Sequence, residues 1–245
     1  MTLKDFFRDI VRGVSGFKFD VVKVTATDTE TKFEAITPDR LLILKGTSKE
    51  VLQDVTGVFG LSNLDILGGI LNLTSMKDDS ASTTVKYTQD GEPEEITFKG
   101  KASKASYRLT AEKAVPKQPN FKAQSFEVEL QPTKASTQEF KEQTSVFGSV
   151  AGNKFTPQVQ SSELKFVLGN SLSSNHNAEF VFCAVDSTST LGGNYKYPID
   201  DTLRALSLAN NSASSTMKLT SKGAMVIEID SGMCKFEYIF PGHSS

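Results

Sequence analysis

Residues 215–241 read STMKLTSKGAMVIEIDSGMCKFEYIFP and contain three short runs rich in β-branched and aromatic side chains. The runs lie at 216–220, 224–230 and 235–240, and turn-forming residues such as Ser-Lys-Gly and Ser-Gly separate them. Short runs of this composition between turn formers are typical of β-strands. The stretch therefore predicts a three-stranded meander that closes a domain.

The residues just before the meander predict a short amphipathic helix. Its apolar positions are Ile199, Leu203 and Leu206. Asp200 and Asp201 stand where a cap and a first-turn acid belong, and two asparagines follow as a stop signal. We therefore expect the chain to enter the meander from a helix.

In this stretch a helix precedes a strand that carries a lysine, and the end reads Phe-x-Tyr-x-Phe-Pro. The order resembles the C-terminus of the DNA sliding clamps. That group comprises the proliferating cell nuclear antigen family and the shorter clamps of tailed phages. The matching residues are Met217, Leu219, Met225, Val226, Ile227, Glu228, Met233, Phe236, Tyr238, Phe240 and Pro241. A second likeness lies at residues 59–73, FGLSNLDILGGILNL, which is similar to the phage-clamp segment where a strand runs into a domain's second helix.

The resemblance implies an α+β protein with the DNA-clamp fold, built from two similar domains that each pack two helices on curved antiparallel sheet. It also implies a function in DNA replication as a polymerase processivity factor. The chain would form a homotrimeric ring around double-stranded DNA without regard to sequence and would tether the replicative DNA polymerase. A clamp loader would be a further partner.

The composition is consistent with such a protein but is not specific to it. The 245 residues suffice for one large β-rich domain or for two domains of roughly 120 residues. The formal net charge is −2, so a DNA contact would need a local basic patch. We expect Cys183 and Cys234 to be small core side chains rather than a disulfide or metal pair.

The location expected from the sequence is the cytoplasm, of the host cell if the protein is viral. The N-terminus does not resemble a signal peptide, because acids interrupt its amphipathic segment. No apolar run approaches the ~20 residues that a membrane-spanning helix requires, so no membrane partner is expected.

A break in periodicity divides the chain. Residues 111–124, AEKAVPKQPNFKAQ, contain two prolines and three lysines and separate two strand-rich halves. We predict an N-terminal clamp domain at 1–112, a connector at 113–123 and a C-terminal clamp domain at 124–245. Each half is predicted to run helix, strands, helix, strands, which suggests a tandem repeat in element order alone.

Four helices and a series of strands are expected. The first helix spans residues 2–14, and a short one follows Phe59, with Gly68-Gly69 allowing close packing on a sheet. Ser136 to Glu139 reads as a capping box that opens a helix through about residue 151, with Phe140, Phe147 and Val150 on its core face. Outside the meander, the predicted strands are 17–27, 31–36, 41–44, 50–58, 84–88, 95–99, 103–110, 125–130, 155–159, 163–168 and 179–185.

Cationic side chains on the helices are the candidate DNA contacts. Lys4, Arg8 and Arg12 recur every four residues opposite the apolar stripe of the first helix. Taken alone, this pattern favours a solvated face partly balanced by Asp5 and Asp9. Because clamp helices turn their polar faces to the duplex, the resemblance favours DNA binding. The full predicted set is Lys4, Arg8, Arg12, Lys134, Lys141 and Arg204.

The candidate partner site joins the connector to the C-terminal end. Large apolar residues at both places suggest a groove, and the clamp family docks short peptides from polymerases and other replication proteins in such a groove. The lining residues would be Val115, Pro116, Ile239, Phe240 and Pro241. The alternative is that Ile239 and Phe240 only complete the core face of the last strand.

No arrangement of residues in the sequence predicts catalysis, a cofactor or a metal site. His176 lies in a Ser/Asn-rich loop and His243 lies near the end of the chain, so neither is a plausible catalytic base. We predict a non-enzyme. The alternative to a clamp is a structural β-rich virion or tail protein, for which Ser/Thr/Asn-rich turns are equally natural.

Overall fold

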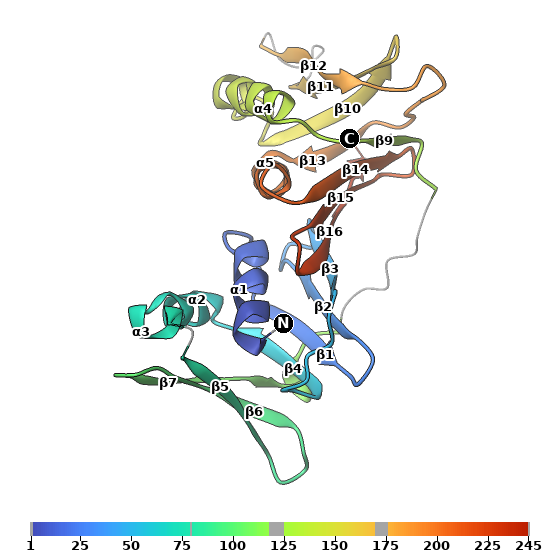
Figure 1. Cartoon of the computed structure of the whole chain (residues 1–245). Helices are drawn as coiled ribbons and strands as arrows, with labels where there is room; N and C mark the ends of the chain where they lie inside the picture. Colours follow the sequence, from blue (N-terminus) through green and yellow to red (C-terminus); the bar gives the residue numbers. More distant parts are fainter. Residues whose placement is uncertain (1, 79, 118–124, 170–175, 245) are drawn as a thin grey trace. The chain divides into compact units, whose positions relative to one another are not determined.

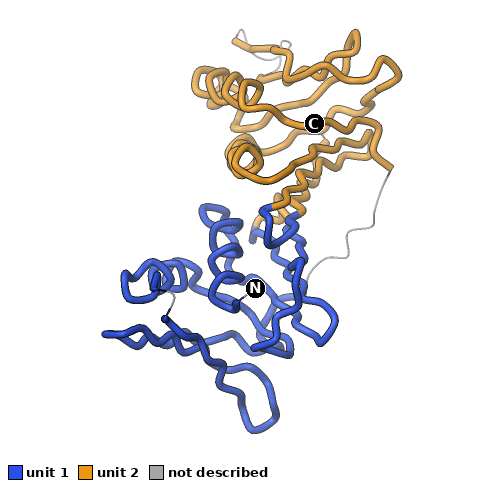
Figure 2. The backbone as a smooth tube through the Cα atoms, in the orientation of Figure 1, with its two compact units in different colours: residues 1–38, 44–120, 231–236 blue, residues 39–43, 121–230, 237–245 orange. Residues whose placement is uncertain are grey.

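The computed structural model describes residues 2–78, 80–117, 125–169 and 176–244, and its backbone divides into two compact units (Figure 2). Unit 1 contains residues 1–38, 44–120 and 231–236, and unit 2 contains residues 39–43, 121–230 and 237–245. The last long strand therefore begins in unit 1 and ends in unit 2.

Unit 1 combines helices with two antiparallel sheets (Figure 1). Its helices are α1 (Leu3–Val14), α2 (Leu64–Asn72), α3 (Thr74–Lys77) and the short 3-10 turn η1 (Glu112–Ala114). Its strands are β1 (Val21–Ala26), β2 (Thr31–Ile36), β3 (Ile43–Ser48), β4 (Gly57–Ser62), β5 (Ser82–Tyr87), β6 (Pro93–Lys99), β7 (Lys104–Arg108) and β8 (Thr110–Ala111). One sheet has the order β8-β4-β1-β2-β3, and the other has the order β5-β6-β7.

Helix α1 forms as its sequence predicts. The Thr2 hydroxyl accepts a hydrogen bond from the Asp5 backbone N–H at 3.2 Å, which caps the first turn. Leu3, Phe6, Phe7, Ile10 and Val14 are buried, and the Phe6 ring contacts the Phe33 ring of β2 edge-on. Phe33 also contacts Phe236, from the part of the last strand that belongs to unit 1. Aromatic packing thus fixes α1 on the sheet.

A buried polar contact connects α1 to the turn before the last long strand, residues 234–241. Asp9 is only 4% exposed, and the Ser231 hydroxyl donates to its carboxylate at 2.6 Å. Ser231 also accepts from the Cys234 backbone N–H at 2.9 Å. A buried carboxylate needs such donors, since its desolvation is otherwise uncompensated.

Unit 2 has the same kinds of element. Its helices are α4 (Lys134–Phe147) and α5 (Ile199–Ala209). Its strands are β9 (Val128–Leu130), β10 (Lys154–Gln160), β11 (Glu163–Leu168), β12 (Ala178–Ala184), β13 (Tyr195–Pro198), β14 (Ser214–Thr220), β15 (Ala224–Asp230), β16 (Cys234–Pro241) and β17 (His243–Ser244). One sheet has the order β12-β11-β10-β13-β17, and β16-β15-β14-β9 run in order in the other.

The meander and the helix before it are confirmed as β14, β15, β16 and α5. Helix α4 packs on the sheet that contains β10, β11 and β12. Its Phe140 ring is fully buried among the rings of Phe155, Phe166, Phe180 and Phe182. This cluster holds α4 against β12, while α5 lies against β15. Both helices therefore have one face fixed by packing and the other free to carry polar residues.

The strand predicted at 50–58 is wrong. Residues 49–56 form bends and loop, and β4 begins only at Gly57. Leu52 and Val55 are buried, so their apolar character serves to anchor a loop rather than to alternate along a strand. The Ser48 hydroxyl closes the turn by donating to the Glu50 carbonyl at 2.6 Å.

The capping box of α4 lies three residues earlier than predicted. The Thr133 hydroxyl accepts from the Ser136 N–H at 3.0 Å, and the Ser136 hydroxyl accepts from the Thr133 N–H at 3.1 Å. Serine thus takes the place of the usual glutamate at the third position. The helix ends at Phe147, so Val150 lies beyond it and is 44% exposed rather than in the core.

The glycine pair of α2 packs on a helix rather than on a sheet. A Cβ at Gly68 would lie 3.2 Å from the Val11 side chain of α1, so the missing side chain lets the two helices approach closely. A Cβ at Gly69 would meet nothing within 4 Å. Only the first glycine has a packing role.

Candidate nucleic-acid interface

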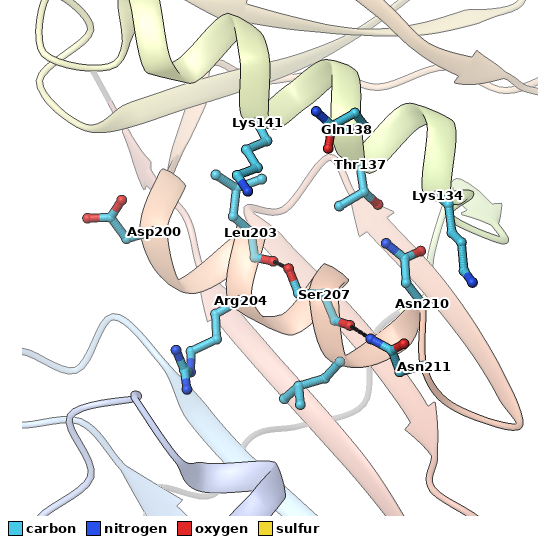
Figure 3. Close-up of a pocket in the computed structure, with 11 residues that line it drawn as sticks. Lys134, Thr137, Gln138, Lys141, Asp200, Leu203, Arg204, Ser207, Asn210 and Asn211 are labelled. Atoms are coloured by element: carbon cyan, nitrogen blue, oxygen red, sulfur yellow. Dashed lines mark hydrogen bonds between the residues drawn. The ribbon is translucent and has the colours of Figure 1, made fainter.

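A groove between α4 and α5 in unit 2 brings together three of the predicted DNA contacts (Figure 3). Its volume is about 770 Å³. The lining residues are Lys134, Thr137, Gln138, Lys141, Asp200, Leu203, Arg204, Ser207, Leu208, Asn210 and Asn211. Lys134, Lys141 and Arg204 come from two helices far apart in sequence, so the fold itself assembles this basic site.

Helical spacing explains how the groove acquires its polar walls. On α4, Lys134, Gln138 and Lys141 are separated by four and three residues and share one stripe. On α5, Asp200 and Arg204 share a stripe in the same way. The opposite sides of the helices carry buried Phe140 and Leu206 respectively.

The groove in unit 2 is rich in neutral hydrogen-bonding groups. Gln138 donates to Glu142 on its own helix at 2.7 Å, and the Asn211 amide donates to the Ser207 carbonyl at 2.8 Å. Lys134 and Lys141 are exposed, and neither side chain has an ion pair within the described ranges. Exposed cations beside amides and hydroxyls suit contact with a sugar-phosphate backbone.

A second groove lies between α1 and α2 in unit 1, with a volume of about 450 Å³. Its lining residues are Arg8, Val11, Arg12, Gly68, Leu71, Asn72 and Lys77. Arg8 is oriented by a hydrogen bond from its guanidinium to the Met76 carbonyl at 3.0 Å. Sequence reasoning did not include Lys77. The available signal was a cation at the end of the helical segment that follows α2.

Lys4 lies differently from the other five predicted DNA contacts. It is only 8% exposed, and its ammonium donates to the Asp78 carbonyl at 3.2 Å, at the end of α3. Hydrogen bonds from Ser80, then one from Lys101, lower the pKa of the Asp78 carboxyl, which stays ionised in this cationic setting. In this structure Lys4 fixes α3 to α1.

The five candidate partner residues fall in two places that the structure describes separately. In unit 1, Val115 is half-buried and packs over Gly60 of β4, while Pro116 is exposed. In unit 2, Ile239 and Phe240 are buried and Pro241 is half-buried. Most of the predicted connector, residues 118–123, lies outside the described residues.

The end of the described chain is held by an aromatic residue that sequence reasoning did not single out. Cβ atoms at Gly193, Gly223 and Gly242 would each lie less than 3 Å from Tyr195. The Gly242 N–H donates to the Gly223 carbonyl at 2.8 Å, and β17 pairs with β13. Three glycines around one ring thus allow the C-terminal segment to continue as a paired strand.

The thiols are poorly suited to nucleophilic chemistry. Cys234 is fully buried and Cys183 is half-buried in β12, and burial raises the pKa of the Cys183 thiol to about 11. The thiolate is therefore scarce at neutral pH. Within the described ranges, no group of three His, Cys, Asp or Glu side chains is placed to hold a metal ion. No helix among the same residues is long and apolar enough to span a membrane.

No protein-family profile and no curated protein matches the sequence. Solved structures do match over nearly the whole chain. One shows the C-terminal region of FEN-1 bound to A. fulgidus PCNA, and it matches with TM-score 0.70 and 11% identity over 100% of this chain and 97% of that one. PCNA from Thermococcus kodakaraensis matches with TM-score 0.68 and 9% identity over 98% and 97%. Proliferating cellular nuclear antigen from Entamoeba histolytica matches with TM-score 0.68 and 10% identity over 98% and 95%.

These comparisons confirm the predicted fold class. The chain is an α+β protein with the DNA-clamp fold of the PCNA structures, at a sequence identity of 9–11%.

Proposed function

We propose that this chain is the protomer of a DNA sliding clamp of the tailed-phage type, a non-enzymatic processivity factor for DNA replication. The observation that carries the proposal is a basic groove between paired helices in each unit of a DNA-clamp fold. A ring that encloses DNA needs no tight phosphate neutralisation, which would impede sliding. A net charge of −2 with two local basic grooves fits that requirement.

The proposed protomer has two similar domains at 1–112 and 124–245, joined by a connector at 113–123. Three protomers would close a ring of six domains. The closing contact would add a strand across two open edges, with β7 of one protomer pairing with β12 of the next. Both strands are at an end of their sheet within the described residues, and such edges invite pairing with another chain.

The proposed DNA contacts are the cations of both grooves. Arg8, Arg12, Lys134, Lys141 and Arg204 would meet phosphates without reading sequence. Lys77 lines the same groove as the first two and joins them in this role. Lys4 belongs to the same helix face and would contribute mainly by positioning α3.

The proposed protein partners are the replicative DNA polymerase and a clamp loader in the cytoplasm. One of the similar structures has a segment of FEN-1 bound to its PCNA, which illustrates peptide docking on this fold. In this chain the docking site would be formed by Val115, Pro116, Ile239, Phe240 and Pro241. Replacing exposed Pro116 and half-buried Pro241 with Glu should then reduce polymerase stimulation while the ring still assembles.

Topology on DNA tests the function. The protein is incubated with nicked circular DNA, its loader and ATP, and gel filtration then separates bound from free protein. A clamp remains on the circle and is released once a restriction enzyme linearises it. Equal retention on both forms would instead indicate ordinary binding, and the absence of retention on the circle would contradict clamp activity.

A further inference from the structure

Only one of the two basic grooves includes an acidic residue among its lining residues, and the proposed function does not explain that acid. The groove in unit 1 is lined by Arg8, Arg12 and Lys77 without any acid. The groove in unit 2 includes a carboxylate, Asp200, beside three cations. Asp200 is exposed, and it has no hydrogen bond or ion pair within the part of the chain that the structure describes. A carboxylate here opposes the binding of phosphate.

Helix stability accounts for only part of the presence of this acid. Asp200 and Asp201 both lie in the first turn of α5, where negative charge is favourable toward the helix N-terminus. Asp201 offers the same interaction to the helix, and only Asp200 of the two lines the groove. Asp200 lies one turn before Arg204 on the same stripe and is a lining residue of the groove, so its negative charge opposes any anion bound there.

We propose that Asp200 is a tuning residue that limits how tightly the α4–α5 groove holds the DNA backbone. The inference rests on the proposed clamp function, because a clamp must touch DNA without stopping on it. Asp200 lowers the formal charge of the groove from three to two and leaves neutral donors such as Gln138 and Asn210 to share the contact. Neutral hydrogen bonds to phosphate release no counterions, so they follow the backbone with little dependence on salt.

The matched variants are Asp200→Asn and Asp201→Asn. Both remove one negative charge from the first turn of α5, and the stability of each variant is measured beside its affinity. Only Asp200→Asn removes the charge from the groove. Arg204→Gln serves as the opposite change, because it removes a cation from the same wall.

The measurement is a nuclear magnetic resonance titration of the isotope-labelled full chain with a short blunt DNA duplex, which needs no loader. At 50 mM salt, Asp200→Asn should bind about two- to five-fold more tightly than the wild type, since unit charges several ångströms apart interact by that order in water. Asp201→Asn should match the wild type.

The outcomes separate this inference from the function on which it rests. If Arg204→Gln weakens binding but Asp200→Asn equals Asp201→Asn, the tuning role is overturned and the DNA contact stands. If the duplex shifts no signal in the groove and Arg204→Gln has no effect, the DNA contact itself fails. Thermal unfolding of each variant shows whether a change in affinity reflects a loss of folded protein.

Discussion

The two glycines of α2 show how differently neighbouring identical residues are constrained. Gly68 lies against Val11 of α1, whereas Gly69 is exposed with open space where a side chain would project. Glycine in the middle of a helix is destabilising relative to alanine by about 0.5–1 kcal/mol. At Gly69 this loss of helix stability is therefore not offset by any close packing that the missing side chain allows among the described residues.

Gly69→Ala should accordingly raise the free energy of unfolding by about 0.5–1 kcal/mol. Gly68→Ala is the control, because its added Cβ lies 3.2 Å from the Val11 side chain and must displace it. Urea unfolding measures both. A Gly69→Ala variant no more stable than Gly68→Ala would show that the α2 backbone differs from the one described.

The buried contact between Asp9 and Ser231 leads to a second prediction. Ser231→Ala removes the donor to a carboxylate that is 4% exposed, which should cost about 1–3 kcal/mol of folding free energy. Ser145→Ala is the control, because that hydroxyl donates to a carbonyl on an exposed turn of α4 and such changes stay within about 0.5 kcal/mol. Equal unfolding midpoints for the two variants would contradict a structural role for the contact.

Individual residues also show the limit of prediction from sequence. The apolar stripe of α1 and the cations opposite it follow from periodicity, because both depend only on spacing along one helix. The carbonyl partner of Lys4 lies 74 residues away on α3, and no local pattern encodes that contact. Burial of Lys4 could therefore not be predicted, although its position on the helix could.

At the scale of elements, turn residues and β-propensity predict the strands correctly where both are pronounced. The meander was predictable because Ser-Lys-Gly and Ser-Gly set its turns and its strands have high β-propensity. The region at 50–58 was misread because buried Leu52 and Val55 occur in a loop, where tertiary packing overrides the pattern. The grooves could not be predicted as such, since each requires two helices to meet.

The cations of α1 and α3 that line the groove in unit 1 support a functional prediction. Reversing Arg12 and Lys77 to Glu should reduce processive synthesis by the cognate polymerase while leaving thermal stability nearly unchanged, because both line an open groove rather than the core. Lys4→Glu should instead lower stability, since it places a carboxylate against the Asp78 carbonyl in a buried position.

Primer extension and thermal unfolding on the same preparations separate these effects. Unchanged processivity in the Arg12 and Lys77 double reversal would mean that the groove in unit 1 is only a solvated surface. Unchanged stability in Lys4→Glu would contradict the role of Lys4 as a link between α1 and α3.

At the scale of the whole molecule, the proposed ring would close through the edge strands β7 and β12. Val181 is 44% exposed on β12, at the edge of its sheet. Val181→Lys should leave the protomer folded but convert the ring to monomers, because lysine on an edge strand opposes pairing with another chain. Thr84→Lys, on the exposed strand β5 of the other unit, is the control and should assemble normally. Light scattering coupled to size-exclusion chromatography gives the masses.

The central claim is that three copies of this chain close into a ring around a hole wide enough for duplex DNA. Electron microscopy of the purified protein alone tests it most directly. Light scattering should give a wild-type mass near three times the 26.7 kDa of the chain. The account predicts closed, six-lobed rings with an open centre, which Val181→Lys abolishes. Single two-lobed particles or open filaments in the wild-type protein would contradict it.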